Sequence, residues 1–361
     1  MGTGPDYGRA VAIQSDGKIL LAGSASIPTY RDFTLLRYNA NGSLDTNFNG
    51  TGKVTTPMSS YDDYGRGIAV QGDGKILVAG YAGSAYVDFA LARYETNGTL
   101  DTTFNSTGRI ITPVGTGDDC GQSVALQADQ RILVAGYARI GTNYDFALVR
   151  YETNGSLDAS FNGSGKVTTA IGTSDDCGQA VAIQTDGRIV VAGYAMIGTN
   201  LDFALVRYQT DGSLDTSFNG TGKVTTPMSS YDDCGQSVVI QGDGKILVAG
   251  YAWDGGFNRF ALARYNSNGT LDTNFNGNGK VTTIFNGYDD RSQSLALQSD
   301  GKILVAGYAS NGYYDYFAVA RYNPNGSLDT SFNGSGKVTT HISSYDDWGA
   351  SVAVQGDGNI L

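Results

Sequence analysis

One segment of about 57 residues recurs along the chain, and this repetition limits the possible folds more than any other feature. The turn before the second apolar run of each copy marks the period. It falls at Gly17, Gly74, Gln130, Gly187, Gly244, Gly301 and Gly358, at intervals of 57, 56, 57, 57, 57 and 57 residues. So regular a period is typical of solenoids, propellers and beaded arrays, in which each copy is stabilised by its neighbours.

Each copy contains four short runs, named A, B, C and D, which are separated by turn residues. Run A, such as residues 123–127, alternates apolar and polar side chains, whereas run B, such as residues 131–137, is almost wholly apolar. Run C, such as residues 145–151, and the short run D, such as residues 165–169, complete the copy. These are strand patterns, and no segment shows helical periodicity, so we expect an all-β protein.

An Asp-Gly pair joins run A to run B in six of the seven copies, as at residues 16–17. Asp-Gly between two strand patterns predicts a hairpin with a type I′ turn, in which both central residues have positive φ. Four antiparallel strands per copy, repeated around an axis, predict a β-propeller of four-stranded blades. A β-solenoid would instead use shorter strands and parallel pairing.

Three strings of the chain resemble the delta-sixty repeat, a bacterial β-propeller family of unknown function. They are GSLDTSFNGTGKVTT at 212–226, QGDGKILVAGYA at 241–252 and FALARYN at 260–266. The resemblance covers essentially the whole chain. It implies a propeller that belongs to a large exported or surface-associated bacterial protein, hence an extracellular or cell-surface location, and it supplies no catalytic residues. The polar start of the chain lacks the pattern of a secretion leader, so we expect any leader to lie outside this segment.

The chain contains six complete A–B–C–D units and half of a seventh. It starts just before a run A, at residues 6–13, and its last residues, Ile360 and Leu361, lie inside a run B. We interpret residues 1–361 as a single β-propeller domain and expect it to be a fragment of a longer repeat protein. A seven-bladed propeller with an incomplete last blade is the favoured prediction, and a six-bladed propeller with an additional hairpin is the alternative.

Composition argues against several classes of function. The net charge of −11 disfavours nucleic acid and anionic membranes as partners, and no apolar run approaches the roughly 18 residues of a membrane span, so no membrane insertion is expected. His341 is the single histidine, and Glu95 and Glu152 lie in turn-like strings. A histidine triad, a histidine metal cluster and a tuned glutamate pair are therefore disfavoured, and we predict a protein that is not an enzyme and requires no cofactor.

The cysteines occupy one position in three successive copies, at Cys120, Cys177 and Cys234. An odd number at equivalent positions does not indicate a disulfide framework. We expect three small, half-buried side chains.

Every complete unit has an arginine in run C and an aspartate in the Leu-Asp pair that follows. Alternation along a strand places the arginine on the same face as apolar residues, where a charged side chain needs a partner. We therefore expect a structural ion pair that holds the C–D connection. The pairs are Arg37 and Asp45, Arg93 and Asp101, Arg150 and Asp158, Arg207 and Asp215, Arg264 and Asp272, and Arg321 and Asp329.

Two consecutive aspartates close each D–A connection. Because run A is the innermost strand of a propeller blade, we expect these pairs around one mouth of the central channel. Turn capping, in which one aspartate accepts backbone N–H groups, is the first interpretation, and a site for calcium or another hard cation is the alternative. The pairs are Asp62 and Asp63, Asp118 and Asp119, Asp175 and Asp176, Asp232 and Asp233, Asp289 and Asp290, and Asp346 and Asp347.

The copies differ most in the B–C loops and at the residue after the aspartate pair. In an antiparallel four-stranded blade these two connections lie at the same end, so one face of the propeller varies and the other is uniform. The varied face is rich in aromatic residues, which suits the binding of a protein or a glycan. The candidate partner-binding residues are Tyr30, Arg31, Tyr64, Tyr86, Tyr144, Trp253, Phe257, Arg291, Tyr313, Tyr314 and Trp348.

These patterns together predict a non-enzymatic binding or scaffold module of a secreted or surface protein, with the partner on the varied face. Two alternatives stay open. One is an aspartate-based glycan-processing enzyme that uses the same face, and the other is a purely structural spacer in a longer repeat protein.

Overall fold

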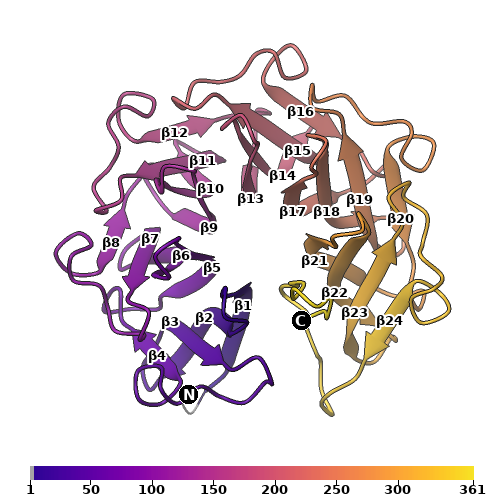
Figure 1. Cartoon of the computed structure of the whole chain (residues 1–361). Helices are drawn as coiled ribbons and strands as arrows, with labels where there is room; N and C mark the ends of the chain where they lie inside the picture. The colour runs from indigo at the N-terminus through magenta and orange to yellow at the C-terminus, as the bar shows by residue number, and fades with distance from the viewer. Residues whose placement is uncertain (1–3) are drawn as a thin grey trace. The chain divides into compact units, whose positions relative to one another are not determined.

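Residues 4–361 are described by the computed structural model, and they form strands joined by turns and loops, with no helix in that range (Figure 1). Strands β1 to β24 make six four-stranded sheets in this part of the chain, and each sheet consists of four consecutive antiparallel strands. One sheet therefore corresponds to one sequence repeat. The predicted all-β class, with one four-stranded antiparallel blade per repeat, is confirmed. The described residues contain no helix long and apolar enough to span a membrane.

The chain divides into two compact units of three blades each. Unit 1 is Met1–Ala170 with Thr210–Ser213, and unit 2 is Ile171–Gln209 with Leu214–Leu361. The strands of unit 1 are β1 (Asp6–Ile13), β2 (Ile19–Ile27), β3 (Tyr30–Tyr38), β4 (Lys53–Thr56), β5 (Tyr64–Val70), β6 (Ile76–Gly83), β7 (Val87–Tyr94), β8 (Arg109–Thr112), β9 (Asp119–Leu126), β10 (Ile132–Ile140), β11 (Asn143–Tyr151) and β12 (Lys166–Thr169).

Unit 2 has the same sequence of elements. Its strands are β13 (Asp176–Ile183), β14 (Ile189–Ile197), β15 (Asn200–Tyr208), β16 (Lys223–Thr226), β17 (Asp233–Ile240), β18 (Ile246–Trp253), β19 (Asn258–Tyr265), β20 (Lys280–Thr283), β21 (Asp290–Leu297), β22 (Ile303–Ser310), β23 (Asp315–Tyr322) and β24 (Lys337–Thr340).

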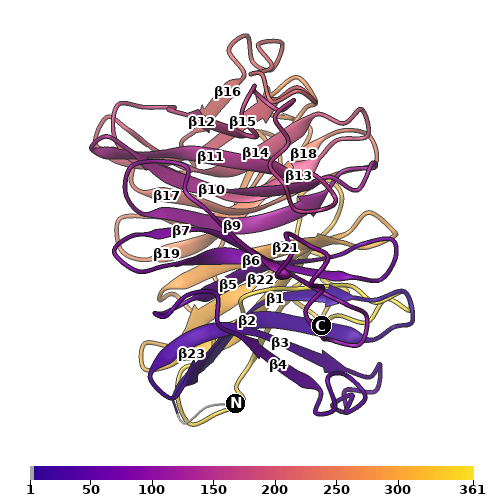
Figure 2. The same ribbon diagram turned by 90° about the vertical axis from the view of Figure 1, so that its left-hand side faces the viewer.

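The first strands of successive blades are neighbours within each unit. Strands β1, β5 and β9 lie side by side in unit 1, as Figures 1 and 2 show, and β13, β17 and β21 do so in unit 2. The hydrophobic core lies between blades: Leu20 and Phe33 of the first blade pack in one cluster with Ile76 and Val78 of the second. Run B is almost wholly apolar because both of its faces are covered by neighbouring sheets.

The favoured prediction of seven blades is not supported, and the six-bladed alternative describes the sheets. After β24 the described residues contain a hairpin turn, in which Gln355 N–H donates to Asn359 C=O at 2.8 Å, and one isolated bridge between Val354 and Ile360. Within residues 1–361 the seventh copy contributes only runs A and B, so it forms no four-stranded sheet there. This partial hairpin contacts the sixth blade, where Val352 N–H donates to the Ser294 hydroxyl at 3.1 Å.

The A–B turns differ from the predicted type I′ geometry. Gly17 has a φ of 81°, but Asp16 is not among the described residues with positive φ, and Gly17 N–H donates to Gln14 C=O at 2.9 Å. The type I′ prediction is therefore wrong, because only the last residue of the turn is left-handed. Gln130 takes the same conformation, with a φ of 66°, where the other copies have glycine.

The first strand of each blade, which corresponds to run A, has a β-bulge just after its first residues. In β9 the pairing with β10 shifts at Gln122, between Gly121 and Ser123. Opposite the bulge, a Cβ on Gly136 would lie 1.9 Å from the Cys120 carbonyl oxygen, so only glycine fits at this position of strand B. A bulge changes the direction in which the side chain of the bulged residue points. The bulged residues are Arg9, Arg66, Gln122, Gln179, Gln236 and Gln293.

Candidate functional site

The B–C loops and the D–A loops lie together at one end of the blades. In unit 1, Asp63 N–H donates to Arg31 C=O at 2.7 Å, and the rings of Tyr30 and Tyr61 are 5.6 Å apart. In unit 2, the rings of Phe257 and Tyr288 are 5.5 Å apart. This loop end of each unit is the varied face that the sequence indicates.

The second aspartate of each pair is buried and caps the D–A loop that precedes it. Asp63 accepts N–H groups from Met58 and Ser59 at 2.7 and 3.0 Å, and Asp233 accepts the equivalent pair at 2.6 and 2.9 Å. Burial raises the pKa of both carboxyl groups, although these hydrogen bonds oppose the rise. The buried members are Asp63, Asp119, Asp176, Asp233, Asp290 and Asp347.

The first aspartate of the pair connects the D–A loop to the preceding blade through a hydrogen bond. Asp62 accepts the N–H of Arg31 at 2.8 Å, and Asp118 accepts the N–H of Val87 at 3.1 Å. In each case the donor lies at the start of strand C, 31 residues earlier. The same contact is made in unit 2 by Asp232, Asp289 and Asp346.

These contacts occupy carboxylate oxygens that a cation would need. Within residues 4–361, no group of three or more His, Cys, Asp or Glu side chains is arranged so that it could hold a metal ion. The geometry favours turn capping for the aspartate pairs. Calcium binding, and the placement of the pairs around a central channel, stay predictions.

The predicted arginine–aspartate pairs form at the other end of the blades. The Nε of Arg93 donates to Asp101 at 2.7 Å, and its Nη1 donates to the Thr153 carbonyl of the following blade at 2.5 Å. The guanidinium also lies 4.4 Å from the centre of the Phe104 ring. The arginines of the first five blades therefore contact their own C–D turn and the following blade, whereas Arg321, within the described part of the chain, contacts only its own turn. The equivalent ion pairs are Arg37–Asp45, Arg150–Asp158, Arg207–Asp215, Arg264–Asp272 and Arg321–Asp329.

Several of the predicted partner-binding residues are exposed at the loop end. Tyr313 is the most open of them, with 87% of its surface accessible. The exposed members are Tyr30, Tyr86, Phe257, Tyr313, Tyr314 and Trp348, and the half-buried ones are Arg31, Tyr64, Tyr144, Trp253 and Arg291.

The structure adds four exposed tyrosines that the sequence reasoning missed. They stand directly before the aspartate pairs, in Tyr-Asp-Asp strings, and this recurring string is the signal that could have identified them. Two of them contact aromatic side chains of a B–C loop, as described for Tyr30 and Phe257. The four are Tyr61, Tyr231, Tyr288 and Tyr345.

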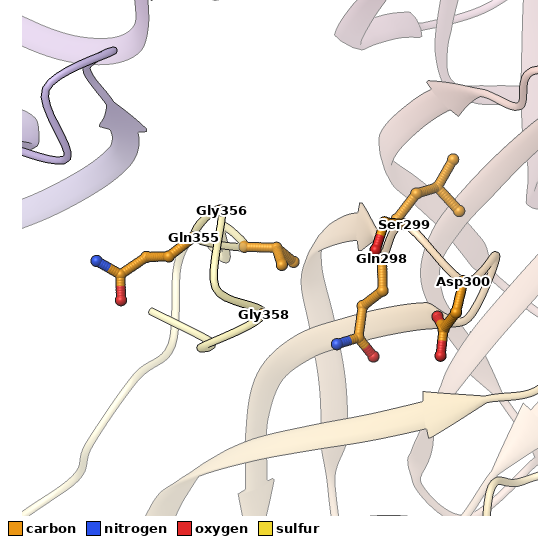
Figure 3. Close-up of a pocket in the computed structure, with 8 residues that line it drawn as sticks. Gln298, Ser299, Asp300, Gln355, Gly356 and Gly358 are labelled. Atoms are coloured by element: carbon orange, nitrogen blue, oxygen red, sulfur yellow. The ribbon is translucent and has the colours of Figure 1, made fainter.

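A cavity of about 440 Å³ lies in unit 2 between two A–B turns, away from the loop end. Figure 3 shows Gln298, Ser299 and Asp300 on one side and Gln355 with the last turn on the other. Asp300 forms an ion pair with Lys302 at 3.4 Å. None of the predicted site residues lines this cavity, so the loop end remains the candidate site.

Six segments of the chain match one family model, described as domain of unknown function (DUF5122) beta-propeller. Each segment runs from the A–B turn to the phenylalanine of the C–D turn. The matched residues are 14–48, 71–104, 127–161, 184–218, 241–275 and 298–332. This match confirms the expectation that the chain belongs to a β-propeller family of unknown function. None of the curated proteins compared with the chain matches it.

Solved structures share the fold at low sequence identity. A catalytically inactive virginiamycin B lyase from Staphylococcus aureus, crystallised with quinupristin, is 8% identical, with a TM-score of 0.55 over 98% of this chain and 90% of that chain. An ulvan lyase is 10% identical, with a TM-score of 0.52 over 90% and 85%. A puromycin hydrolase mutant is 14% identical, with a TM-score of 0.56 over 98% and 49%. At these identities the likeness concerns the fold alone.

Proposed function

The chain belongs to the family described as domain of unknown function (DUF5122) beta-propeller, and we propose that it is a non-enzymatic module that binds a glycan at the loop end of its blades. The observation that carries this proposal is the pairing of exposed aromatic rings from different loops. Tyr30 of a B–C loop lies beside Tyr61 of the next D–A loop, and Phe257 lies beside Tyr288 in the same way.

Exposed aromatic rings of this kind suit carbohydrate. The apolar face of a sugar packs on a flat ring, and tyrosine adds a hydroxyl group that can donate or accept a hydrogen bond. Tyr30, Tyr61 and Tyr288 have 42 to 48% of their surface exposed, so the rings are accessible without rearrangement. An exported or surface-bound bacterial protein, which the delta-sixty resemblance implies, would meet such ligands.

The aspartate pairs support a binding role over a catalytic one. A glycan-processing enzyme needs two carboxyl groups that are free to exchange protons or attack the substrate. Here Asp62 and Asp63 accept backbone N–H groups and hold the loops in place. The enzyme alternative would require these contacts to open.

A glycan array probed with the full chain tests the proposal. We expect binding to defined glycans, weakened about three- to tenfold by Tyr30→Ala or by Tyr61→Ala, because each removes one ring of an exposed pair. Ile111→Ala is the matched control, since it removes an exposed apolar side chain on strand β8, outside the loops.

The outcomes separate the three alternatives. Failure to bind any glycan would reject the proposal and favour the structural spacer. Shortened products after incubation with a bound glycan would identify an enzyme instead. Binding that Ile111→Ala weakens as much as Tyr61→Ala does would also reject the loop end as the site.

A further inference from the structure

Three arginines and three tyrosines form a continuous stack at the loop end of the first two blades. In a chain of net charge −11, such a concentration of positive charge is a local exception. All six side chains are half-buried, so each keeps part of its surface open to solvent. The members of this Arg–Tyr stack are Arg9, Arg31, Arg66, Tyr7, Tyr64 and Tyr81.

Arg31 lies between two tyrosine rings. Its guanidinium carbon is 5.5 Å from the centre of the Tyr7 ring and 5.7 Å from the centre of the Tyr64 ring. Arg9 lies 5.3 Å from the centre of the same Tyr7 ring. Arg31 Nη1 also donates to the Tyr64 hydroxyl at 3.1 Å. The rings thus fix the positions of two guanidinium groups.

The stack continues through Tyr81 to the third arginine. The rings of Tyr64 and Tyr81 are stacked at 5.0 Å, and the Arg66 guanidinium carbon is 5.3 Å from the centre of the Tyr81 ring. Arg66 Nη2 donates to the Tyr81 hydroxyl at 2.7 Å. Arg9 and Arg66 are the bulged residues of β1 and β5, so the two bulges direct both side chains into the stack.

The positive charges are poorly neutralised by the chain itself. Asp62 lies 3.7 Å from Arg31, but in the described range no carboxylate lies within ion-pair distance of Arg9 or Arg66. The Nε atoms of Arg31 and Arg66 are buried without a hydrogen-bond acceptor. Burial and the Arg66 charge together lower the pKa of Arg9. An anion placed among the three guanidinium groups would relieve this repulsion and supply acceptors.

The other blades show that the fold does not require these arginines. At the bulge position, the third to sixth blades have Gln122, Gln179, Gln236 and Gln293. Where Tyr7 and Tyr64 stand, the third to fifth blades have Cys120, Cys177 and Cys234. The tyrosine equivalent to Tyr81 recurs, for example as Tyr137. Arg9 and Arg66 are therefore additions to a blade that also folds with glutamine at this position.

We propose that the Arg–Tyr stack binds an oxyanion, the carboxylate or sulfate group of an acidic sugar. Guanidinium groups form paired hydrogen bonds with planar or tetrahedral oxyanions, and the tyrosine rings beside them can cover the sugar. This inference rests on the proposed glycan-binding function, because it names the class of glycan: one that carries uronic acid or sulfate groups.

The test uses the full chain and two small probes, sodium glucuronate and sodium sulfate. NMR signals of the arginine Nε–H groups report binding directly. We expect saturable shifts of the Arg9, Arg31 and Arg66 signals with at least one probe, while the signal of Arg188, at an A–B turn, stays in place. The two probes distinguish a carboxylate site from a sulfate site. Absence of saturable shifts with both probes would overturn the inference.

Variants that copy the chain's own repeats complete the test. Arg9→Gln and Arg66→Gln reproduce the glutamine of the other blades, and each should weaken binding of the probe about tenfold, followed through the Arg31 signal. Arg188→Gln removes the same charge elsewhere and should have no effect. Should Arg66→Gln lose its fold, the Arg9→Gln variant, which leaves the Arg66–Tyr81 hydrogen bond intact, gives the same readout. Unchanged affinity in Arg9→Gln and Arg66→Gln would reject the site.

The glycan array tests the proposed function and the probe titration tests the oxyanion site, so either proposal can be rejected while the other is kept. Binding of neutral glycans alone would leave the proposed function in place and reject the acidic ligand. Saturable shifts with glucuronate or sulfate in a chain that binds no glycan would keep the oxyanion site and reject its assignment to a sugar.

Discussion

The Nε of Arg207 donates a hydrogen bond to Asp215 Oδ2 at 2.7 Å, and 4% and 1% of the two side chains are exposed. The guanidinium lies 4.5 Å from the centre of the Phe218 ring, and Arg207 also donates to the Ser267 carbonyl of the following blade. One side chain thus holds its own C–D turn and the next blade. Hydrogen bonds from Ser217 and Arg207 lower the pKa of Asp215 although burial opposes this.

Replacing Arg207 by alanine should lower the free energy of unfolding by about 3–5 kcal/mol, because it leaves the Asp215 carboxylate buried without its main partner. Urea unfolding followed by circular dichroism measures the change. Arg188 is the matched control: it lies 3.2 Å from the same carboxylate but is 37% exposed, so Arg188→Ala should cost about 1 kcal/mol or less. Equal losses in both variants would contradict the structural role of Arg207.

Asp290 should make unit 2 less stable as the pH rises. Burial raises its pKa to about 6, against the opposing effects of the Phe285 N–H and of Arg259. In the unfolded chain an aspartate has a pKa of about 3.9, so the native state binds the proton more tightly. The stabilisation that protonated Asp290 gives the native state is present below about pH 4 and is lost as the pH rises through about 6.

The melting temperature of the chain and of Asp290→Asn, measured from pH 4 to pH 7, isolates this contribution. We expect the melting temperature of Asp290→Asn to fall less between pH 4 and pH 7 than that of the unchanged chain. Asp215, whose pKa is lowered, acts in the opposite direction: its contribution is present above about pH 4 and is lost on acidification. Parallel curves for the two proteins would show that Asp290 does not titrate in this range.

The blades and the Arg–Asp pairs could be predicted because both follow from periodicity. Alternation with a period of two defines the strands, and it also places Arg207 on a buried face, where only a carboxylate such as Asp215 can neutralise it. The turn type could not be predicted in this way. Asp16 and Gly17 permit a type I′ turn, but the hydrogen bond from Gly17 to Gln14 selects a turn with only one left-handed residue.

The candidate site was harder to predict, since its contacts join residues far apart in the sequence. The Asp62 carboxylate accepts the N–H of Arg31, the second residue of β3 in the preceding blade, and no local pattern indicates this. The Arg–Tyr stack depends on the bulges at Arg9 and Arg66, which direct the side chains and are invisible in a simple alternation of polar and apolar residues.

Gln130 should be a point of strain in the third blade. It adopts a φ of 66° at the turn position where other copies have glycine, and a left-handed residue other than glycine costs about 1–2 kcal/mol. Part of the gain from Gln130→Gly is offset by the greater freedom of the unfolded chain, so we expect a net stabilisation of about 0.5–1 kcal/mol. Calorimetry of this variant and of the reverse change, Gly187→Gln, should show shifts of opposite sign. A lower melting temperature for Gln130→Gly would refute the strain.

The cysteines should be unreactive in the folded protein. Burial raises the pKa of the Cys120 and Cys234 thiols to about 11, and Cys177 is buried at the equivalent position. Since the thiolate is the reactive form, a thiol reagent such as DTNB at about pH 8 should label the native chain slowly and the urea-unfolded chain at all three positions. Rapid labelling of the native chain would mean that these positions are open to solvent.

Calcium should leave the melting temperature unchanged. Asp233 accepts hydrogen bonds from the N–H of Met228 at 2.6 Å and from the Ser229 hydroxyl at 2.8 Å, and Asp232 accepts the N–H of Leu201 at 2.9 Å. A calcium ion needs about six to eight oxygen ligands, so it could bind this pair only by breaking contacts that hold the loop. A ligand of the native state raises the melting temperature, so thermal melting in millimolar calcium and in EDTA tests the point. A rise with calcium that disappears in Asp232→Asn would instead establish the cation site, because that change removes a carboxylate charge while an oxygen remains to accept the Leu201 N–H.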